Sequence, residues 1–301
     1  MKNGRVALVV ALVATVALAR SAAADTGVLD TILDEGLHAS QTWYPAASSY
    51  ARSFYAPLLA LDLALMGITW LLASMRREWG LGEAVGELCR RVMLVGLVAA
   101  GLTLYPLFVS SIFSTFQKMG ATISGTDAVS PSLILDRGIL LASAILGAGI
   151  SSGWAILGIG SLFSVGAALI ILLAFALVAA RLLEVLLKGY IIVGAGIIFL
   201  PFGANRIFAG LAENSVLLVF RTAIQVFILQ ILVGLGEQFT YSWIDFLDHY
   251  DPNQGLAPLL QVCGGAIAFA WITLSLPNEI ASVLTSSSSF FGWRDAMRSS
   301  R

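Results

Sequence analysis

The chain has 301 residues, of which 58% are hydrophobic and only 12% are charged, and its formal net charge is −1. The charged share is about half of that in an average soluble domain. This composition excludes an ordinary water-soluble domain, and the near-neutral balance gives no support to a nucleic-acid-binding surface. We therefore expect a protein that lies mostly in a membrane.

Residues 1–24 have the three parts of a secretory signal peptide. Lys2 and Arg5 precede an apolar run over residues 6–19, and three alanines then precede Asp25. This order is typical of a segment that is removed after export. An uncleaved first span is the alternative. Cleavage would place the start of the mature chain outside the cytoplasm.

Residues 25–53 are predicted to form an amphipathic helix on the periplasmic face of the membrane. Apolar residues recur among acidic ones at about helical spacing, and Trp43 and Tyr44 follow them. Tryptophan and tyrosine favour the level of the lipid headgroups, so these two residues are expected to anchor the helix.

Five longer apolar runs are predicted to cross the membrane as helices. They are residues 54–75, 92–113, 163–183, 215–236 and 259–276. With these spans the arginine-rich ends all fall on one side, which the positive-inside rule assigns to the cytoplasm. Residues 54–276 then form the transmembrane domain, and residues 277–301 form a cytoplasmic tail.

The glycine-rich run over residues 133–160 leaves two alternatives open. It has the apolar character of a further span. Its six glycines and its serines also suit a helix that packs within a bundle or against the outer face of the membrane. We favour the periplasmic face. Residues 163–183 then run toward the cytoplasm, and the arginine-rich ends stay on the cytoplasmic side, as the positive-inside rule requires.

The apolar stretch that follows Lys188 is expected to dip into the protein and turn back. It is shorter than a span, contains three glycines and ends at Pro201. Proline interrupts helical hydrogen bonding, and such backbone is tolerated at membrane depth where protein surrounds it. The predicted fold class is therefore all-α: a polytopic membrane protein with about five transmembrane helices, a re-entrant hairpin and a periplasmic-face amphipathic helix.

No catalytic, cofactor-binding or metal-binding group is predicted. The two histidines, His38 and His249, lie far apart in predicted external segments, and the spacing of a zinc site or a phosphate-binding loop does not occur. An intramembrane serine protease would need a histidine or lysine beside a serine within the spans, and the spans contain no histidine. We therefore do not expect an enzyme.

A few charged residues lie in or near the predicted spans, where insertion of a charge is costly. Arg181, Glu184 and Lys188 have the spacing of ion pairs on one helix. They either form a cluster at a cytoplasmic helix end, with side chains reaching the interface, or line the inner mouth of a pore or an assembly contact. Asp62 lies nearer to the middle of a span. It either partners a buried arginine or faces a pore.

Residues 189–206 carry the most specific pattern in the chain, GYIIVGAGIIFLPFGANR. With the signal peptide and the external segment that ends at Trp43 and Tyr44, this pattern resembles the TrbL family of conjugal-transfer proteins. Members of that family are polytopic inner-membrane components of type IV secretion systems. The similarity extends over about residues 25–276. It marks these pore or assembly candidates: Tyr190, Gly194, Gly196, Phe202, Gly203 and Arg206.

The resemblance implies a ring-forming channel or platform, expected to be a pentamer. Such a ring helps to move DNA or protein across the bacterial inner membrane and supports pilus biogenesis. The implied partners are membrane lipid, further copies of the chain, the translocated DNA or protein, pilus subunits, and other inner-membrane secretion components, including an ATPase and bitopic scaffold proteins. No cofactor is implied.

Two other classes of protein stay open. A small-solute transporter or an ion channel unrelated to secretion would also be polytopic, but a transporter is expected to show repeated halves with paired broken helices. This chain has one broken segment and no second copy of it. A passive scaffold without a lumen is the other alternative.

Overall fold

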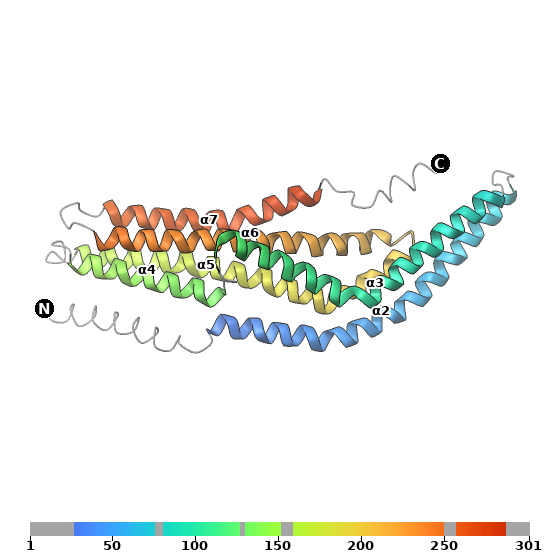
Figure 1. The fold of residues 1–301 in the computed structure, drawn as a ribbon, viewed down its shortest axis with the longest axis horizontal. Coiled ribbons are helices and arrows are strands. Elements are labelled where there is room, and N and C mark those ends of the chain that lie inside the picture. The colour runs from blue at the N-terminus through green and yellow to red at the C-terminus, as the bar shows by residue number, and fades with distance from the viewer. Residues whose placement is uncertain (1–26, 76–80, 127–129, 152–158, 250–256, 287–301) are drawn as a thin grey trace. The chain divides into compact units, whose positions relative to one another are not determined.

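The structure is a computed structural model that describes residues 27–75, 81–126, 130–151, 159–249 and 257–286. These ranges contain α-helices and one 3-10 helix, and no strand. The elements are α2 (Val28–Met75), α3 (Leu81–Ser124), α4 (Pro131–Ser151), α5 (Ile159–Ala195), η2 (Gly196–Ala204), α6 (Ala209–Asp248) and α7 (Ala257–Ser286) (Figure 1). The predicted all-α class is confirmed.

Six of these helices are long and apolar enough to cross a membrane. The prediction was about five. The additional helix is α4, whose residues 131–148 meet the length and hydropathy of a span despite their glycines. The predicted signal peptide lies outside the described residues. Of the predicted tail, residues 277–286 complete α7, and the rest also lies outside them.

Several helices are much longer than a bilayer is thick. Helix α2 has 48 residues, which at the usual helical rise is about 72 Å, whereas the hydrocarbon core measures about 30 Å. Pro45 and Pro57 both lie inside α2. The predicted boundary between the amphipathic segment and the first span, at residues 53 and 54, therefore falls within one continuous helix.

The chain divides into two compact units. Of the described residues, those within 27–34, 116–186 and 224–286 form the first, here called the bundle unit, and those within 35–115 and 187–223 form the second, the motif unit. In the bundle unit, side chains of α4, α5, α6 and α7 share a packed core. Its fully buried members include Leu141, Ile145, Ile171, Leu182, Leu229 and Leu259.

In the motif unit, α2 and α3 pair as an antiparallel hairpin. The Tyr55 hydroxyl donates to the Val95 carbonyl at 3.0 Å, and Asp62 lies opposite Arg91. This pairing offsets the predicted spans 54–75 and 92–113 by roughly 20 Å along the helices. The two apolar runs therefore do not lie side by side over their full lengths, because the register follows the buried polar pairs.

The backbone after Lys188 takes a different course from the expected re-entrant hairpin. Helix α5 continues without a break to Ala195, and the chain then tightens into η2, which contains Pro201. The chain reverses only at residues 205–208, before α6 begins. Glycine costs a helix only about 1 kcal/mol relative to alanine, so close packing around Gly189 and Gly194 is sufficient to keep the helix intact.

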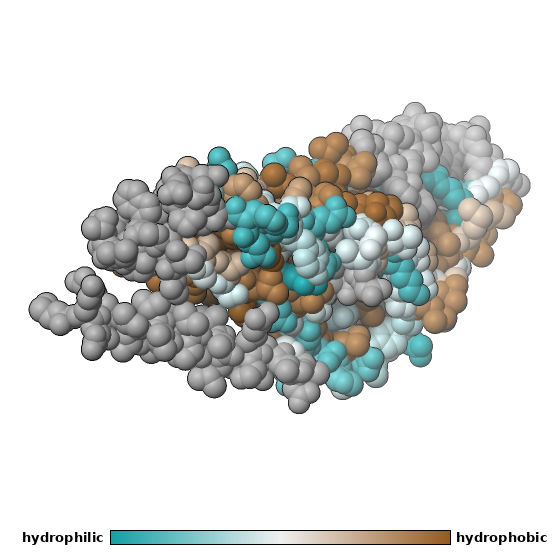
Figure 2. All heavy atoms as spheres, turned by 60° about the vertical axis from the view of Figure 1, so that its left-hand side comes forward, coloured by the Kyte–Doolittle hydropathy of each residue, from teal (hydrophilic) through white to brown (hydrophobic). Residues whose placement is uncertain are grey.

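Large hydrophobic side chains are exposed on every helix. The face shown in Figure 2 has broad hydrophobic areas with separate hydrophilic patches between them. Monomeric soluble proteins rarely expose apolar patches of this extent. The surface is that of a protein covered by lipid or by other subunits.

Candidate functional site

Two glycines of the 189–206 stretch lie where α5 gives way to η2, and both are in close contact with neighbouring helices. A Cβ atom at Gly194 would lie 2.8 Å from the backbone oxygen of Ser40 and 2.9 Å from its Cα atom. A Cβ atom at Gly196 would lie 2.3 Å from the hydroxyl of Tyr105. Any larger residue at either position requires α2 or Tyr105 to move.

Tyr105 of α3 holds this transition from the other side. Its hydroxyl donates to the carbonyl of Ile192 at 2.8 Å, and its side chain is buried. In a 3-10 helix each N–H bonds three residues back instead of four, so carbonyls near the change of helix type lose their usual partners. The Tyr105 hydroxyl supplies a donor at this point. The hydroxyl therefore stabilises the backbone where α5 changes into η2. Gly196, which lacks a side chain, leaves room there for Tyr105.

A small hydrophobic core surrounds the turn. Ala47 and Ala51 of α2 pack there against residues of α3, α5, η2 and α6. The other buried members are Leu102, Tyr105, Val109, Ile192, Ile197 and Val219. Alanine at the two α2 positions permits a close approach of the helices, as small residues do at helix contacts in membranes. Tyr190 lies outside this core, against an earlier part of α2, with its ring 3.6 Å from the position of a Cβ at Gly36.

Charged side chains meet at the end of η2 in a group that we call the four-charge cluster (Asp62, Glu87, Arg91 and Arg206). Arg91 binds Asp62 Oδ2 at 3.1 Å through Nη1 and Glu87 Oε1 at 3.3 Å through Nε. The backbone N–H of Arg206 donates to Asp62 Oδ1 at 3.1 Å, and its Nη2 lies 3.3 Å from Glu87 Oε1. The cluster therefore joins α2, α3 and the chain after η2.

Burial makes this cluster important for stability. Asp62 is 2% exposed and Arg91 is 7% exposed. Removing one partner of a buried ion pair typically costs about 3–5 kcal/mol, because the remaining charge stays out of water. Asp62 thus partners a buried arginine, which was one of its two predicted roles. The arginine is Arg91.

The remaining residues of the stretch fix the chain reversal. Asn205 is fully buried, and its Oδ1 accepts a hydrogen bond from the N–H of Ile207 at 2.9 Å. The ring of Phe202 lies 6.3 Å from that of Phe54 and 6.1 Å from that of Phe208, measured between centroids. A Cβ at Gly203 would lie 3.2 Å from the Cβ of Ala212. The Phe54 and Ala212 contacts position the reversal against α2 and α6, and the other two hold the reversal together.

The predicted charge group Arg181, Glu184 and Lys188 is divided between the two units. Arg181 forms an ion pair with Glu184 and donates to the Oδ1 of Asn278 in α7. Gln225 of α6 donates to the same oxygen at 2.9 Å. Arg181 therefore helps to hold α5, α6 and α7 together. Lys188 is half-buried in the motif unit, and its role stays a prediction.

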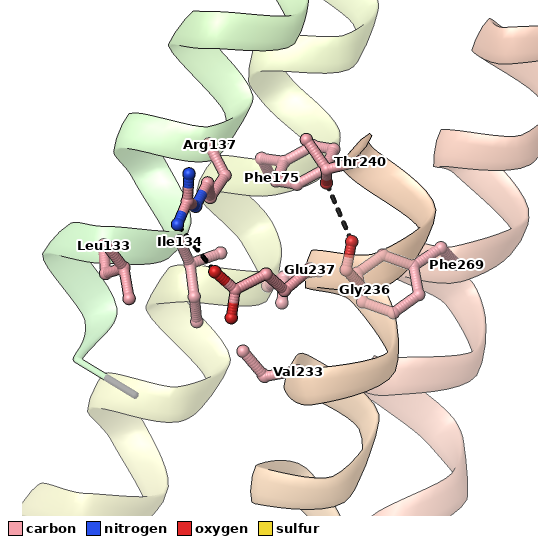
Figure 3. Close-up of a pocket in the computed structure, with 10 residues that line it drawn as sticks. Leu133, Ile134, Arg137, Phe175, Val233, Gly236, Glu237, Thr240 and Phe269 are labelled. Atoms are coloured by element: carbon pink, nitrogen blue, oxygen red, sulfur yellow. Dashed lines mark hydrogen bonds and ion pairs between the residues drawn. The ribbon is translucent and has the colours of Figure 1, made fainter. Parts of the chain in front are cut away.

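The bundle unit also contains the ion pair of Arg137 with Glu237, whose atoms Nη2 and Oε1 are 2.6 Å apart. Figure 3 shows these side chains pointing toward each other from α4 and α6, beside an apolar pocket that Phe175 and Phe269 help to line. The guanidinium carbon of Arg137 lies 4.9 Å from the centroid of the Tyr241 ring. The space has room for about one water molecule, which is too small for a substrate.

The sequence reasoning missed several residues of the site. The charge pattern of residues 76–91 predicts a short cytoplasmic loop that forms a helix or a hairpin turn; in the structure Glu87 and Arg91 belong to the helix α3, which begins at Leu81. Their signal was the i, i+4 spacing of an acid and a base directly before an apolar run. Ser40 and Tyr105 gave no signal, because each acts through contacts that are distant in sequence.

Comparison with known proteins gives the family. A family model described as "TrbL/VirB6 plasmid conjugal transfer protein" matches residues 59–276. The chain belongs to the TrbL/VirB6 family. The matched range includes the four-charge cluster and the whole 189–206 stretch, so the predicted resemblance is confirmed. Residues 25–58, for which the resemblance was also predicted, precede the match.

Two relatives of this TrbL/VirB6 chain carry matching names. A "Probable conjugal transfer protein TrbL" from Sinorhizobium fredii (strain NBRC 101917 / NGR234) is 27% identical over 237 residues, which are 77% of this chain and 57% of that protein. A "Conjugal transfer protein TrbL" from Rhizobium radiobacter is 25% identical over 212 residues, 70% of this chain and 51% of that protein. The chain thus spans about half the length of the relatives it matches.

Family membership and the six apolar helices together establish a multi-pass membrane protein, as predicted for the bacterial inner membrane. Among the residues that the structure describes, no three histidine, cysteine, aspartate or glutamate side chains are grouped as a metal site requires. Gly194, Gly196 and Gly203 of this TrbL/VirB6 chain lie at close packing contacts, and Asp62 and Arg206 lie in ion pairs or hydrogen bonds of the four-charge cluster.

Proposed function

We propose that the chain is a non-enzymatic inner-membrane component of a conjugal type IV secretion system. Several copies assemble into a ring, a pentamer by the family resemblance, that acts as a channel or platform for the translocation of DNA or protein and for pilus biogenesis. The observation that carries the proposal is the family match over residues 59–276, which takes in the four-charge cluster and the glycine-rich turn.

The packing of the bundle unit supports a conduit between copies rather than through a single copy. The largest buried side chains of this unit fill its interior, and the pocket beside Arg137 and Glu237 admits about one water molecule. A translocated strand or polypeptide needs far more space. In a ring, the space enclosed by neighbouring copies supplies it, and Lys188 is the candidate for a charge at the inner mouth, because Arg181 is already bound to Glu184 and Asn278.

The partners follow from the same proposal. Membrane lipid covers part of the exposed apolar surface, and an ATPase, bitopic scaffold proteins and pilus subunits of the secretion system contact the ring. The transported molecule is DNA or protein. None of these roles requires a cofactor.

Gene deletion and complementation test the proposed function. Deleting the gene is expected to abolish conjugal transfer from the donor cell, and supplying the full chain is expected to restore it. Transfer frequency is the measurement, and growth of the donor on the same medium is the control for general membrane damage. Unchanged transfer after deletion would contradict the proposal.

A further inference from the structure

Three arginine side chains converge on one glutamate at the end of η2. Arg91 Nε and Arg206 Nη2 each lie 3.3 Å from Glu87 Oε1. Arg90 Nη1 lies 3.8 Å from Glu87 Oε2. Asp62 supplies a second carboxylate, which binds Arg91. We call these five residues the arginine group. With three positive and two negative side chains, the group carries a net charge of +1.

The excess positive charge lies on the accessible side of the group. The side chains of Arg90 and Arg206 are 38% and 37% exposed, whereas that of Arg91 is 9% exposed and is paired with Asp62. Among the described residues, Glu87 is the one carboxylate that contacts either of the two exposed arginines. A guanidinium group has several N–H donors, so both arginines have donors available for an additional anion.

The exposed arginines lie where two apolar runs end at the same level. Residues 92–113 of α3 contain no charged residue, and Arg90 lies just before them. Residues 189–205 also contain none, and Arg206 directly follows them. Both arginines contact Glu87, so the two runs end side by side. For α3 and η2 this level is therefore the boundary between lipid hydrocarbon and headgroups, and the positive-inside rule assigns it to the cytoplasmic face.

Exposed apolar side chains adjoin both arginines. Met93 and Leu97 lie three and seven residues after Arg90, on the same face of α3, and are 75% and 57% exposed. Ile207, next to Arg206, is 64% exposed. A free anion would use only the guanidinium groups. An anionic phospholipid uses both kinds of surface, since its phosphate accepts paired N–H donors from arginine and its acyl chains cover apolar side chains.

We infer that Arg90 and Arg206 bind the headgroup phosphate of an anionic glycerophospholipid, whose acyl chains lie against the adjoining face of α3. The net positive charge of the arginine group favours a lipid with a net negative charge over a zwitterionic one. All the residues of the site belong to one copy of the chain, so lipid binding does not depend on the proposed ring.

Titration with defined lipids tests the site. The full chain is purified in a mild neutral detergent, depleted of lipid and titrated with dioleoylphosphatidylglycerol. Its unfolding temperature is measured, because a ligand of the folded state raises that temperature. Dioleoylphosphatidylcholine and inorganic phosphate are the comparison ligands. The test variant combines Arg90→Gln with Arg206→Gln. The control variant combines Arg52→Gln with Arg221→Gln, which removes two other exposed arginines of the motif unit.

Phosphatidylglycerol is expected to raise the unfolding temperature of the unmodified chain and of the control variant, and the other two ligands are not. In the test variant the half-saturating lipid concentration is expected to be at least about tenfold higher, because contacts to a charged phosphate are lost. Each variant is compared with its own lipid-free temperature, so a loss of stability from the substitutions does not affect the result. If the test variant does not fold, Arg90→Gln alone, with Arg52→Gln as its control, gives the same comparison.

Four results would each overturn the inference. They are an equal response to phosphatidylcholine, an equal response to inorganic phosphate, the same half-saturating concentration in the test variant as in the unmodified chain, and an equal loss of lipid binding in the control variant. A response to inorganic phosphate would indicate a site for free anions instead of lipid. An equal loss in the control variant would indicate a general effect of charge.

Discussion

Replacing Asp62 by asparagine is expected to destabilise the protein by up to about 3–5 kcal/mol, because the buried Arg91 then loses its most deeply buried counter-charge. Arg91 is 7% exposed, and its remaining partner, Glu87, is shared with Arg206. Thermal unfolding of the protein in detergent and the yield of extracted protein measure this loss. Arg90→Gln is the control, since Arg90 is more exposed and lies 3.8 Å from Glu87; it is expected to cost less than about 1 kcal/mol.

A double substitution distinguishes loss of the ion pair from general damage at this position. Buried ion pairs replaced by apolar residues of similar volume are often neutral or stabilising. Asp62→Leu combined with Arg91→Met is therefore expected to recover most of the stability that either single change removes. A double variant as unstable as the sum of the single variants would show that the Asp62–Arg91 pair is not the interaction that matters.

Alanine at Gly194 is expected to destabilise the motif unit, whereas alanine at Gly166 of the same helix is expected to stabilise the protein. At Gly194 the new Cβ meets the backbone of Ser40, which cannot rotate away, and overpacking of this kind costs about 1–3 kcal/mol. At Gly166 nothing lies within 4 Å of the new Cβ, and alanine is favoured over glycine in a helix by about 0.5–1 kcal/mol. Unfolding temperatures of the two variants should shift in opposite directions, and equal shifts would contradict the close approach of α2 and α5.

Gly196 offers a second check of the same turn. Its Cβ would meet the Tyr105 hydroxyl, while the next atoms are 3.5 Å away. Removing that hydroxyl with Tyr105→Phe makes room for alanine at position 196, although it also takes a donor from the Ile192 carbonyl. The double variant Gly196→Ala, Tyr105→Phe should therefore lose less stability than the two single changes added together, as is usual for residues in contact. Strict additivity would indicate that the two side chains do not meet.

Local patterns in the sequence were sufficient to predict the fold class and some of the residues of the candidate site. Apolar runs of span length predicted an all-α membrane protein, and the glycines and Arg206 of the 189–206 stretch marked the turn that the structure forms between α5 and α6. Hydropathy alone did not give the helix ends. It favoured a break at Lys188, but α5 continues to Ala195, because contacts with Ser40 and Phe113 support the helix at Gly194 and Gly189.

The partner of Asp62 could not be derived from sequence, because pairing depends on the register of α2 against α3. Asp62 and Arg91 are 29 positions apart, and several arginines in the same region were equally good candidates by spacing. The offset of the two apolar runs also follows from this register. A single helix's periodicity carries no information on which residue of a neighbouring helix lies opposite, so such pairs become visible only in three dimensions.

The native mass of the complex, extracted from cells that carry the secretion system and measured in a mild detergent, is the most direct test of the central claim that this TrbL/VirB6 chain forms a ring. A ring is expected to give a single species with a mass that is a whole multiple of the chain mass, five copies by the family resemblance, in preparations whose donor cells transfer DNA. A transfer-competent preparation that contains only single copies of the chain would contradict it.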